Sequence, residues 1–194
     1  MAGIGLRLPD TPWLNVNIED TLLFASLDAL ELDEPEVLDM LATWFHTHHA
    51  RIIAERFIHL VHAAANADLV PMWRAIATLR PMRHETRFDR LRRPVERPLA
   101  KLPSLQSNAV LSPPELAAHH RGYILRTLFG PTARADVWAF LELDPHERVG
   151  DLARIAHCSF ATAWRTKRDF MLAAEGSRLK QARSCQEEEA DPAT

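Results

Sequence analysis

Residues 149–170 read VGDLARIAHCSFATAWRTKRDF, and this stretch decides the expected fold of the C-terminal part of the chain. Leu152 and Ile155 give a short first helix its apolar face, and Ala153 is small enough for a second helix to cross closely. A turn follows, and Ser159 is a suitable N-cap for the second helix. The spacing therefore predicts a helix-turn-helix.

The second helix of this unit is expected to have two faces. Ala163 and Phe170 point back into the core. The opposite face would lie in the major groove if the unit binds DNA, and Arg165 is the best candidate for a bidentate contact with guanine. The positions expected on that exposed face are Phe160, Ala161, Thr162, Trp164, Arg165 and Arg168.

Further residues complete the expected DNA contacts. Arg154, Thr166 and Lys167 are suited to phosphates, which position a protein on the duplex without reading its sequence. Ser159 is also included among the DNA-binding residues. Trp164 has two interpretations of equal weight, because an exposed tryptophan packs on sugar and base or belongs to a protein interface.

The motif resembles a known family pattern, Leu-Ala-x-x-x-Gly-x-Ser-x-x-Thr-x-x-Arg. The chain has Leu152, Ala153, Ser159, Thr162 and Arg165 in the matching positions. The preceding LFGPTARADVWAFLEL, residues 128–143, looks like the lead-in helix of winged-helix regulators of the ArsR/MarR type. The similarity extends to helix-turn-helix domains found beside nucleotidyltransferases and in toxin–antitoxin regulators, and it covers residues 111–175. It implies a DNA-binding transcription regulator.

The chain departs from that pattern in three places. His157 stands where glycine is usual, and a left-handed backbone costs histidine less than most residues. Lys167 stands where the family often has leucine. In the winged-helix family the second helix is followed by a two-stranded wing. In this chain residues 170–186, FMLAAEGSRLKQARSCQ, instead predict more helix with a break at Gly176. The wing is either lost or replaced by helix.

The N-terminal part reads as an acidic helical domain, residues 1–79. Apolar residues recur at helical spacing from Ile18 to Leu30, and Pro35 is placed to begin a second helix. That second pattern continues to Ala65, with a possible break around residues 47–49. Residues 1–73 carry 3 basic and 11 acidic side chains, which makes this segment a poor surface for DNA.

A basic segment rich in proline and arginine follows, and residues 80–110 are expected to form a linker. Residues 74–101 carry 9 basic and 3 acidic side chains. Charge runs of this kind are usually solvated connectors. The functional alternative is phosphate contact through Arg90, Arg92 and Arg93 beside the DNA-binding domain.

The rest of the chain divides into a helix-turn-helix domain at residues 111–183 and an acidic, disordered tail at 184–194. Ser112 and Glu115 form a capping box that begins a helix running to about Phe129. Gly130-Pro131 ends it, and another helix covers about 132–143. The expected fold class is thus mainly α, with an N-terminal helical domain and a winged-helix-like C-terminal domain without its wing.

Several function classes lack a sequence signal. No phosphate loop, nucleophile elbow or Cys-His arrangement is visible, so we expect no catalytic residues, no cofactor and no enzyme activity. The two cysteines have no metal-type spacing, and no apolar run is long enough to cross a membrane. The expected location is the cytoplasm.

A local histidine cluster offers the best alternative site. On one continuous helix His48, Glu55, His59 and His62 would project to one side. Their spacing matches neither a zinc-protease pair nor a di-iron motif. A solvated polar face or a dimer contact is therefore favoured, and no metal site is predicted.

Two function hypotheses follow from these patterns. The first is a sequence-specific DNA-binding regulator, expected to be a repressor, that binds double-stranded DNA as a homodimer. Its dimer contact would come from residues 17–78 and 111–129, with Phe24, Trp44, Phe45 and Phe57 as candidate apolar surface. The second is a protein-interaction module, such as an antitoxin-like partner-binding protein, that keeps the helix-turn-helix fold without binding DNA.

Overall fold

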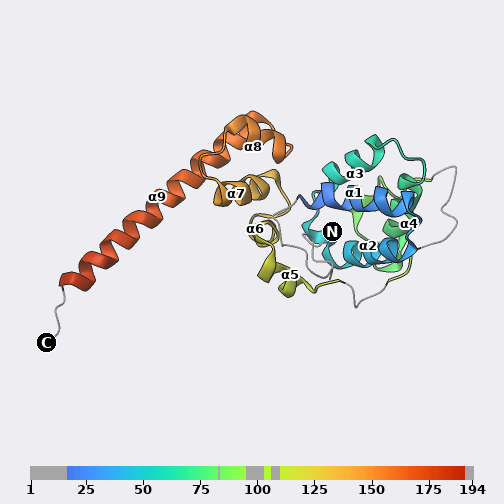
Figure 1. Cartoon of the computed structure of the whole chain (residues 1–194), viewed down its shortest axis with the longest axis horizontal. Coiled ribbons are helices and arrows are strands. Elements are labelled where there is room, and N and C mark those ends of the chain that lie inside the picture. The colour runs from blue at the N-terminus through green and yellow to red at the C-terminus, as the bar shows by residue number, and fades with distance from the viewer. Residues whose placement is uncertain (1–16, 83, 95–102, 106–109, 191–194) are drawn as a thin grey trace. The chain divides into compact units, whose positions relative to one another are not determined.

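The computed structural model is mainly helical (Figure 1). It describes residues 17–82, 84–94, 103–105 and 110–190, with residues 81 and 178–190 by backbone alone. Within these residues there are nine α-helices and no strand, which confirms the expected fold class at the all-α level. The helices are α1 Ile18–Glu31, α2 Pro35–His48, α3 Ala54–Ala63, α4 Leu69–Thr78, α5 Pro113–His119, α6 Arg121–Phe129, α7 Ala133–Leu143, α8 Val149–Ile155 and α9 Phe160–Ala190.

The chain forms two compact units, Met1–Thr132 and Ala133–Thr194. This division differs from the expected boundary near residue 110. Helices α5 and α6 belong to the first unit, because Leu116 and Tyr123 are buried in the same core as α1–α4. Residues far apart in the sequence share this core, and no local pattern marks such contacts. Composition alone therefore predicts a domain boundary near residue 110, earlier than the observed division after Thr132.

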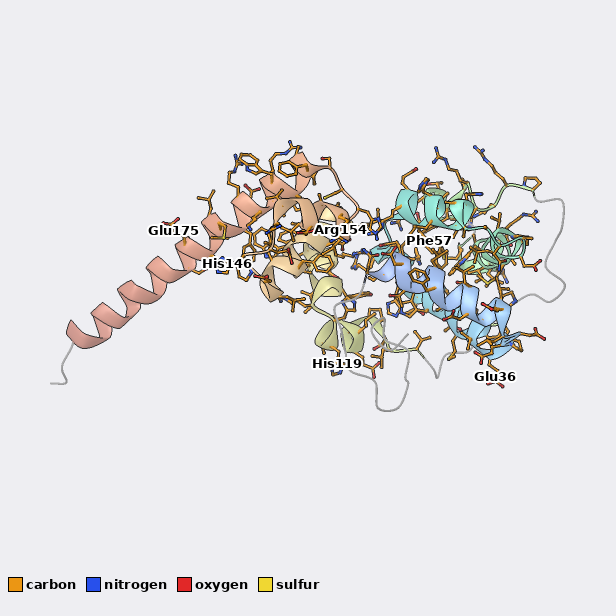
Figure 2. The ribbon with its side chains drawn as sticks, turned by 45° about the horizontal axis from the view of Figure 1, so that its top comes forward. Glu36, Phe57, His119, His146, Arg154 and Glu175 are labelled. Carbon is orange, nitrogen blue, oxygen red and sulfur yellow. The ribbon has the colours of Figure 1, made fainter. Side chains whose placement is uncertain are left out.

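The first unit is built around an aromatic core. Asn17 caps α1 by accepting hydrogen bonds from two backbone amides of the first turn, and Pro35 begins α2 as predicted. Phe45 packs against Phe57 and Trp73 at centroid distances of 5.9 and 5.2 Å. Figure 2 shows Phe57 within the helices of this unit. Aromatic side chains bury large apolar areas, so this cluster contributes strongly to the unit's stability.

The expected break in the second helical pattern is confirmed, although it lies slightly later in the chain. Helix α2 ends at His48, a 3₁₀ turn covers His49–Arg51, and α3 begins at Ala54. The predicted polar face is therefore wrong for His48, which lies on α2 and is buried, while Glu55, His59 and His62 share α3. The direction change between α2 and α3 separates them.

The arginine-rich segment is packed rather than a solvated linker as far as it is described. Residues Arg80–Met82 and Thr86–Phe88 form 3₁₀ turns, and Met82, Phe88 and Leu91 are core residues, each at most 1% exposed. The expectation of a linker is wrong for residues 80–82 and 84–94, because three apolar side chains between the arginines are spaced so that they reach the core. Residues 95–102 and 106–109 lie outside the described residues.

A buried ion pair joins the two ends of the first unit. Arg126 on α6 donates to both carboxylate oxygens of Glu19 on α1, at 2.6 and 2.8 Å, and both residues are at most 1% exposed. The Ile53 amide also donates to Glu19, at 2.8 Å. Burial alone would raise the pKa of the Glu19 carboxyl, but Arg126, the Ile53 amide and Arg56 together outweigh burial and hold this pKa below its usual value.

A second buried polar contact lies between α2 and α6. Nε2 of His48 is 2.9 Å from the Leu111 carbonyl oxygen, which can only accept, so this nitrogen carries the proton. Nδ1 then accepts from the Tyr123 hydroxyl at 2.9 Å. Burial lowers the pKa of His48 to about 4, against the opposing effect of its bond to Leu111. The imidazole is therefore neutral at physiological pH.

The helix expected from residue 112 to Phe129 is divided in two. The capping box of Ser112 and Glu115 is confirmed at the start of α5. His120 then adopts an extended backbone and caps α6, with Nδ1 accepting from the Tyr123 amide at 3.0 Å. Gly130 ends α6 with a φ of 77°, a conformation that costs glycine little.

The second unit consists of α7, α8 and α9 around a small core. Val137, Leu141, Leu152 and Ala163 are fully buried in it. Helix α9 is 31 residues long and extends beyond α7 and α8 (Figure 1). The predicted break at Gly176 is wrong, since the helix continues through it. Helix α9 reaches Ala190, so disorder is also the wrong expectation for residues 184–190, and residues 191–194 lie outside the described residues.

The surface aromatics expected for a dimer contact are mostly interior. Trp44, Phe45 and Phe57 are 0% exposed, and of the four candidates only Phe24 remains on the surface, at 61%. The first unit needs these side chains for its own core. In the part of the chain that the structure describes, no helix is both long enough and apolar enough to cross a membrane.

The buried ion pair yields a stability prediction. Arg126→Met should lower the free energy of unfolding by up to about 3–5 kcal/mol, because Glu19 would stay buried without its bidentate partner and with Arg56, at 3.6 Å, as its remaining cation among the described residues. Urea denaturation followed by tryptophan fluorescence measures this. Arg90→Gln removes an exposed pair with Glu55 and should cost less than about 1 kcal/mol. Equal effects of the two variants would contradict the assignment.

The neutral histidine yields a pH prediction. Because the pKa of His48 falls from 6.5 to about 4 on folding, the unfolded chain binds this proton first as the pH drops. The stabilisation is complete above pH 6.5 and is lost between pH 6.5 and 4, by about 3 kcal/mol in total. The difference in stability between wild type and His48→Gln, measured by urea denaturation across this range, should shrink accordingly. A pH-independent difference would show that His48 does not titrate as stated.

Candidate nucleic-acid interface

The turn between α8 and α9 is set by local backbone bonds. The Cys158 amide donates to the Ala153 carbonyl at 2.9 Å, and the His157 amide donates to the Arg154 carbonyl at 3.2 Å. Together they satisfy carbonyls that the end of α8 would otherwise leave unpaired, in the pattern of a left-handed helix end. His157 occupies the left-handed position with a φ of 48°, as its alignment with the family's glycine predicted.

Ser159 begins the second helix of the pair. Its hydroxyl oxygen accepts from the Thr162 amide at 3.1 Å and lies 2.9 Å from the Thr162 hydroxyl. The predicted N-cap is therefore confirmed, and it fixes where α9 starts. On the inner side Ala163 is fully buried, and Phe170 packs edge-on against Trp138 at 5.2 Å. Both residues face inward as predicted.

The outer face of the first turns of α9 carries aromatic and basic side chains. Phe160 is 63% exposed and Trp164 49% exposed, and Ala161, Arg165 and Arg168 are exposed beside them. Residues three or four apart share one side of a helix, so these five form a continuous surface. We call it the α9 outer face. It contains no acidic side chain.

The two arginines of the α9 outer face are positioned differently. The guanidinium of Arg168 lies 5.4 Å from the centre of the Trp164 ring and pairs with Asp169 at 3.3 Å. The Nε atom of Arg165 donates to the Ala161 carbonyl one turn earlier, at 3.1 Å. That bond directs Arg165 toward the start of α9 and leaves the other nitrogens of its fork for a ligand.

Three of the expected DNA contacts serve the fold instead. Thr166 is only 3% exposed and donates to the Thr162 carbonyl, so its predicted phosphate contact is wrong. The Lys167 ammonium donates to the Glu147 carbonyl at 2.5 Å and is half-buried, which fastens α9 to the loop before α8. Thr162 is half-buried beside the Ser159 cap. A lysine stem can cover apolar surface in place of leucine, which explains that departure from the family pattern.

Charge around the interface is balanced. Residues 133–177 carry six basic and seven acidic side chains. Arg154 is 75% exposed but pairs with Asp151 at 3.0 Å, and Arg134 pairs with Asp169 at 3.4 Å. Among these described residues, exposed basic side chains lie on the α9 outer face and at Arg134, Arg148 and Arg154, and any attraction for a polyanion is local.

The arginines of the first unit do not form one phosphate-binding arm. Arg92 donates to the carbonyls of Ala77, Met82 and Glu85 and pairs with Asp89, so it holds its own segment together. Its predicted DNA contact is wrong. Arg90 pairs with Glu55 at 2.8 Å, whereas Arg93 is exposed. Among the described residues no cluster of three or more histidine, cysteine or carboxylate side chains could hold a metal ion.

Two of the predicted DNA contacts serve the fold in ways that the sequence does not indicate. The roles of Lys167 and Arg92 depend on backbone carbonyls elsewhere in the fold, for which no sequence signal exists. Comparison of the chain with protein-family models, with curated proteins and with solved structures finds no match in any of the three. The residues and their geometry are thus the only basis for a function.

Proposed function

We propose that the chain is a sequence-specific DNA-binding regulator whose α8–α9 pair acts as a helix-turn-helix. One observation carries this proposal: the α9 outer face is exposed, begins at a fixed N-cap, and presents Arg165, whose Nε bond to Ala161 leaves its other fork nitrogens for a ligand. Such a helix end fits the major groove, where an arginine fork reads guanine and an aromatic ring contacts a thymine methyl group.

The contacts divide by role. Arg165 reads a base, since its free fork nitrogens lie near the start of α9, the part of a recognition helix that meets base edges. Arg168, held over the Trp164 ring, and Arg154 on α8 contact phosphates and set the register. Two half-sites need two copies, so the proposal includes a homodimer.

A second candidate function is supported by a specific observation. Phe160, Trp164, Met171 and Leu172 leave a run of exposed apolar side chains along α9. Protein interfaces are enriched in aromatic residues, methionine and arginine. A protein-interaction module without DNA binding would use this run for its partner, and its α9 outer face would be covered by protein.

The first prediction here concerns DNA. Arg165→Ala should weaken binding to the preferred site by about 1–3 kcal/mol and relax discrimination at one base pair. The site is first selected from random duplexes with the full chain and checked against the DNA upstream of its gene by electrophoretic shift. The control, Arg80→Ala, removes an exposed arginine of the other unit and should change nothing. Failure to enrich any sequence would contradict the proposal.

The second prediction concerns assembly. Phe24 and Leu32 are exposed on the first unit, at 61% and 66%. If that unit forms the dimer, Phe24→Ser with Leu32→Ser should give a monomer in light scattering at micromolar concentration. Phe160→Ser with Trp164→Ser should keep the dimer mass while losing DNA affinity. The reverse pattern, with self-association lost only in the α9 variant, would support the interaction module instead.

A further inference from the structure

A pocket of about 460 Å³ opens on the surface of the first unit, and none of its lining residues belongs to the α9 outer face. Three segments line it: α3, the first turn of α4, and the residues that follow Phe88. The volume falls within the range of small-molecule sites. Neither the DNA-binding proposal nor the core of the unit uses this space.

The wall of the pocket is basic and polar. His59 and His62, one turn apart on α3, are exposed, as is Arg93 on the opposite segment, and no hydrogen bond or ion pair joins any of the three to another described residue. Arg90 also lines the pocket and pairs with Glu55 at 2.8 Å. That pair is internally neutral. Of the two arginines that line the pocket, Arg93 is therefore the one without a counter-ion among the described residues.

The floor of the pocket is apolar. Ile58 and Leu91 are almost completely buried, and the half-buried Val70 lies beside them. An apolar floor below an unpaired guanidinium matches a ligand with two parts. A hydrocarbon body covers the floor, and an anionic group meets the arginine fork, whose geometry fits a planar carboxylate.

We infer that this pocket binds a small organic carboxylate with an apolar body. Arg93 binds the carboxylate, His59 and His62 donate further hydrogen bonds to it, and Ile58, Val70 and Leu91 contact the hydrocarbon. The Glu55–Arg90 pair, which is internally neutral, closes one side. The inference does not rest on the proposed function, because no residue of the α9 outer face takes part.

The experiment uses the full chain labelled with ¹⁵N and 4-phenylbutyrate as the probe. Titration should give saturable shifts of amide signals in α3 and at Val70, with a dissociation constant of about 0.1–1 mM for a ligand of this size. The matched neutral probe is 4-phenylbutanol, which keeps the ring and chain but lacks the charge. It should bind at least about tenfold more weakly.

Variants separate the pocket from general attraction for anions. Arg93→Gln should weaken phenylbutyrate binding about tenfold or more, and His59→Ala with His62→Ala should weaken it less. Arg80→Gln, an exposed arginine outside the pocket, should leave the affinity unchanged. Thermal melts check that the variants fold. We expect them to fold, because the substituted side chains are exposed.

Three results would overturn the inference. They are equal binding of the alcohol and the acid, an unchanged affinity in Arg93→Gln, and the absence of saturable shifts in α3 up to 10 mM probe, roughly tenfold above the weakest affinity expected. Each is independent of DNA binding, so a failure here leaves the proposed function standing, and loss of the proposed function leaves this site intact.

Discussion

The bidentate ion pair of Glu19 and Arg126 is the contact on which the first unit depends. It joins its first described helix to its last, and Glu19 also accepts the amide of Ile53 at the start of α3. Three segments thus meet at one carboxylate that is shielded from water. Removing Arg126 leaves the buried Glu19 carboxylate with the more distant Arg56, at 3.6 Å, as its remaining cation among the described residues, which costs more than the pair itself contributes. The pair therefore enforces a particular arrangement of α1, α3 and α6 more than it adds to net stability.

The uneven distribution of charge along the sequence also reflects ion pairs within the first unit. An acidic segment is followed by a basic one, and this order suggested a basic arm beside a DNA-binding domain. In the folded unit Arg90 of the basic segment pairs with Glu55 of the acidic one, and Arg87 and Arg92 pair with Glu85 and Asp89 within the basic segment itself. Most charged side chains in this region pair with one another. The net charge of a sequence segment does not show whether its charges pair within the chain or bind another molecule. In the described part of the segment Arg93, at the rim of the pocket, and the exposed Arg80 have no acidic partner.

Local features could be predicted from the sequence and distant ones could not. The turn at His157, the Ser159 cap, the Ser112 capping box and the end of α6 at Gly130 each depend on a few consecutive residues. Their spacing is therefore visible in the sequence. The pairing of Glu19 with Arg126 spans 107 positions, and the His48 contact with Tyr123 spans 75. No periodicity marks such partners, so the unit boundary was placed too early and the arginine segment was misjudged.

The candidate interface was found for the same reason, since it belongs to a local motif, but its charge could not be foreseen. Lys167 and Thr166 are used by the fold, and Arg154 and Arg168 have acidic neighbours. Few cations therefore remain to release counter-ions from DNA, and an interface of this kind must gain its affinity from close contact with the groove. The aromatic rings of Phe160 and Trp164 are the side chains on the α9 outer face that can supply such contact. The same rings would equally suit a protein surface, and the arginine fork of Arg165 on the same outer face is the feature that favours a base edge.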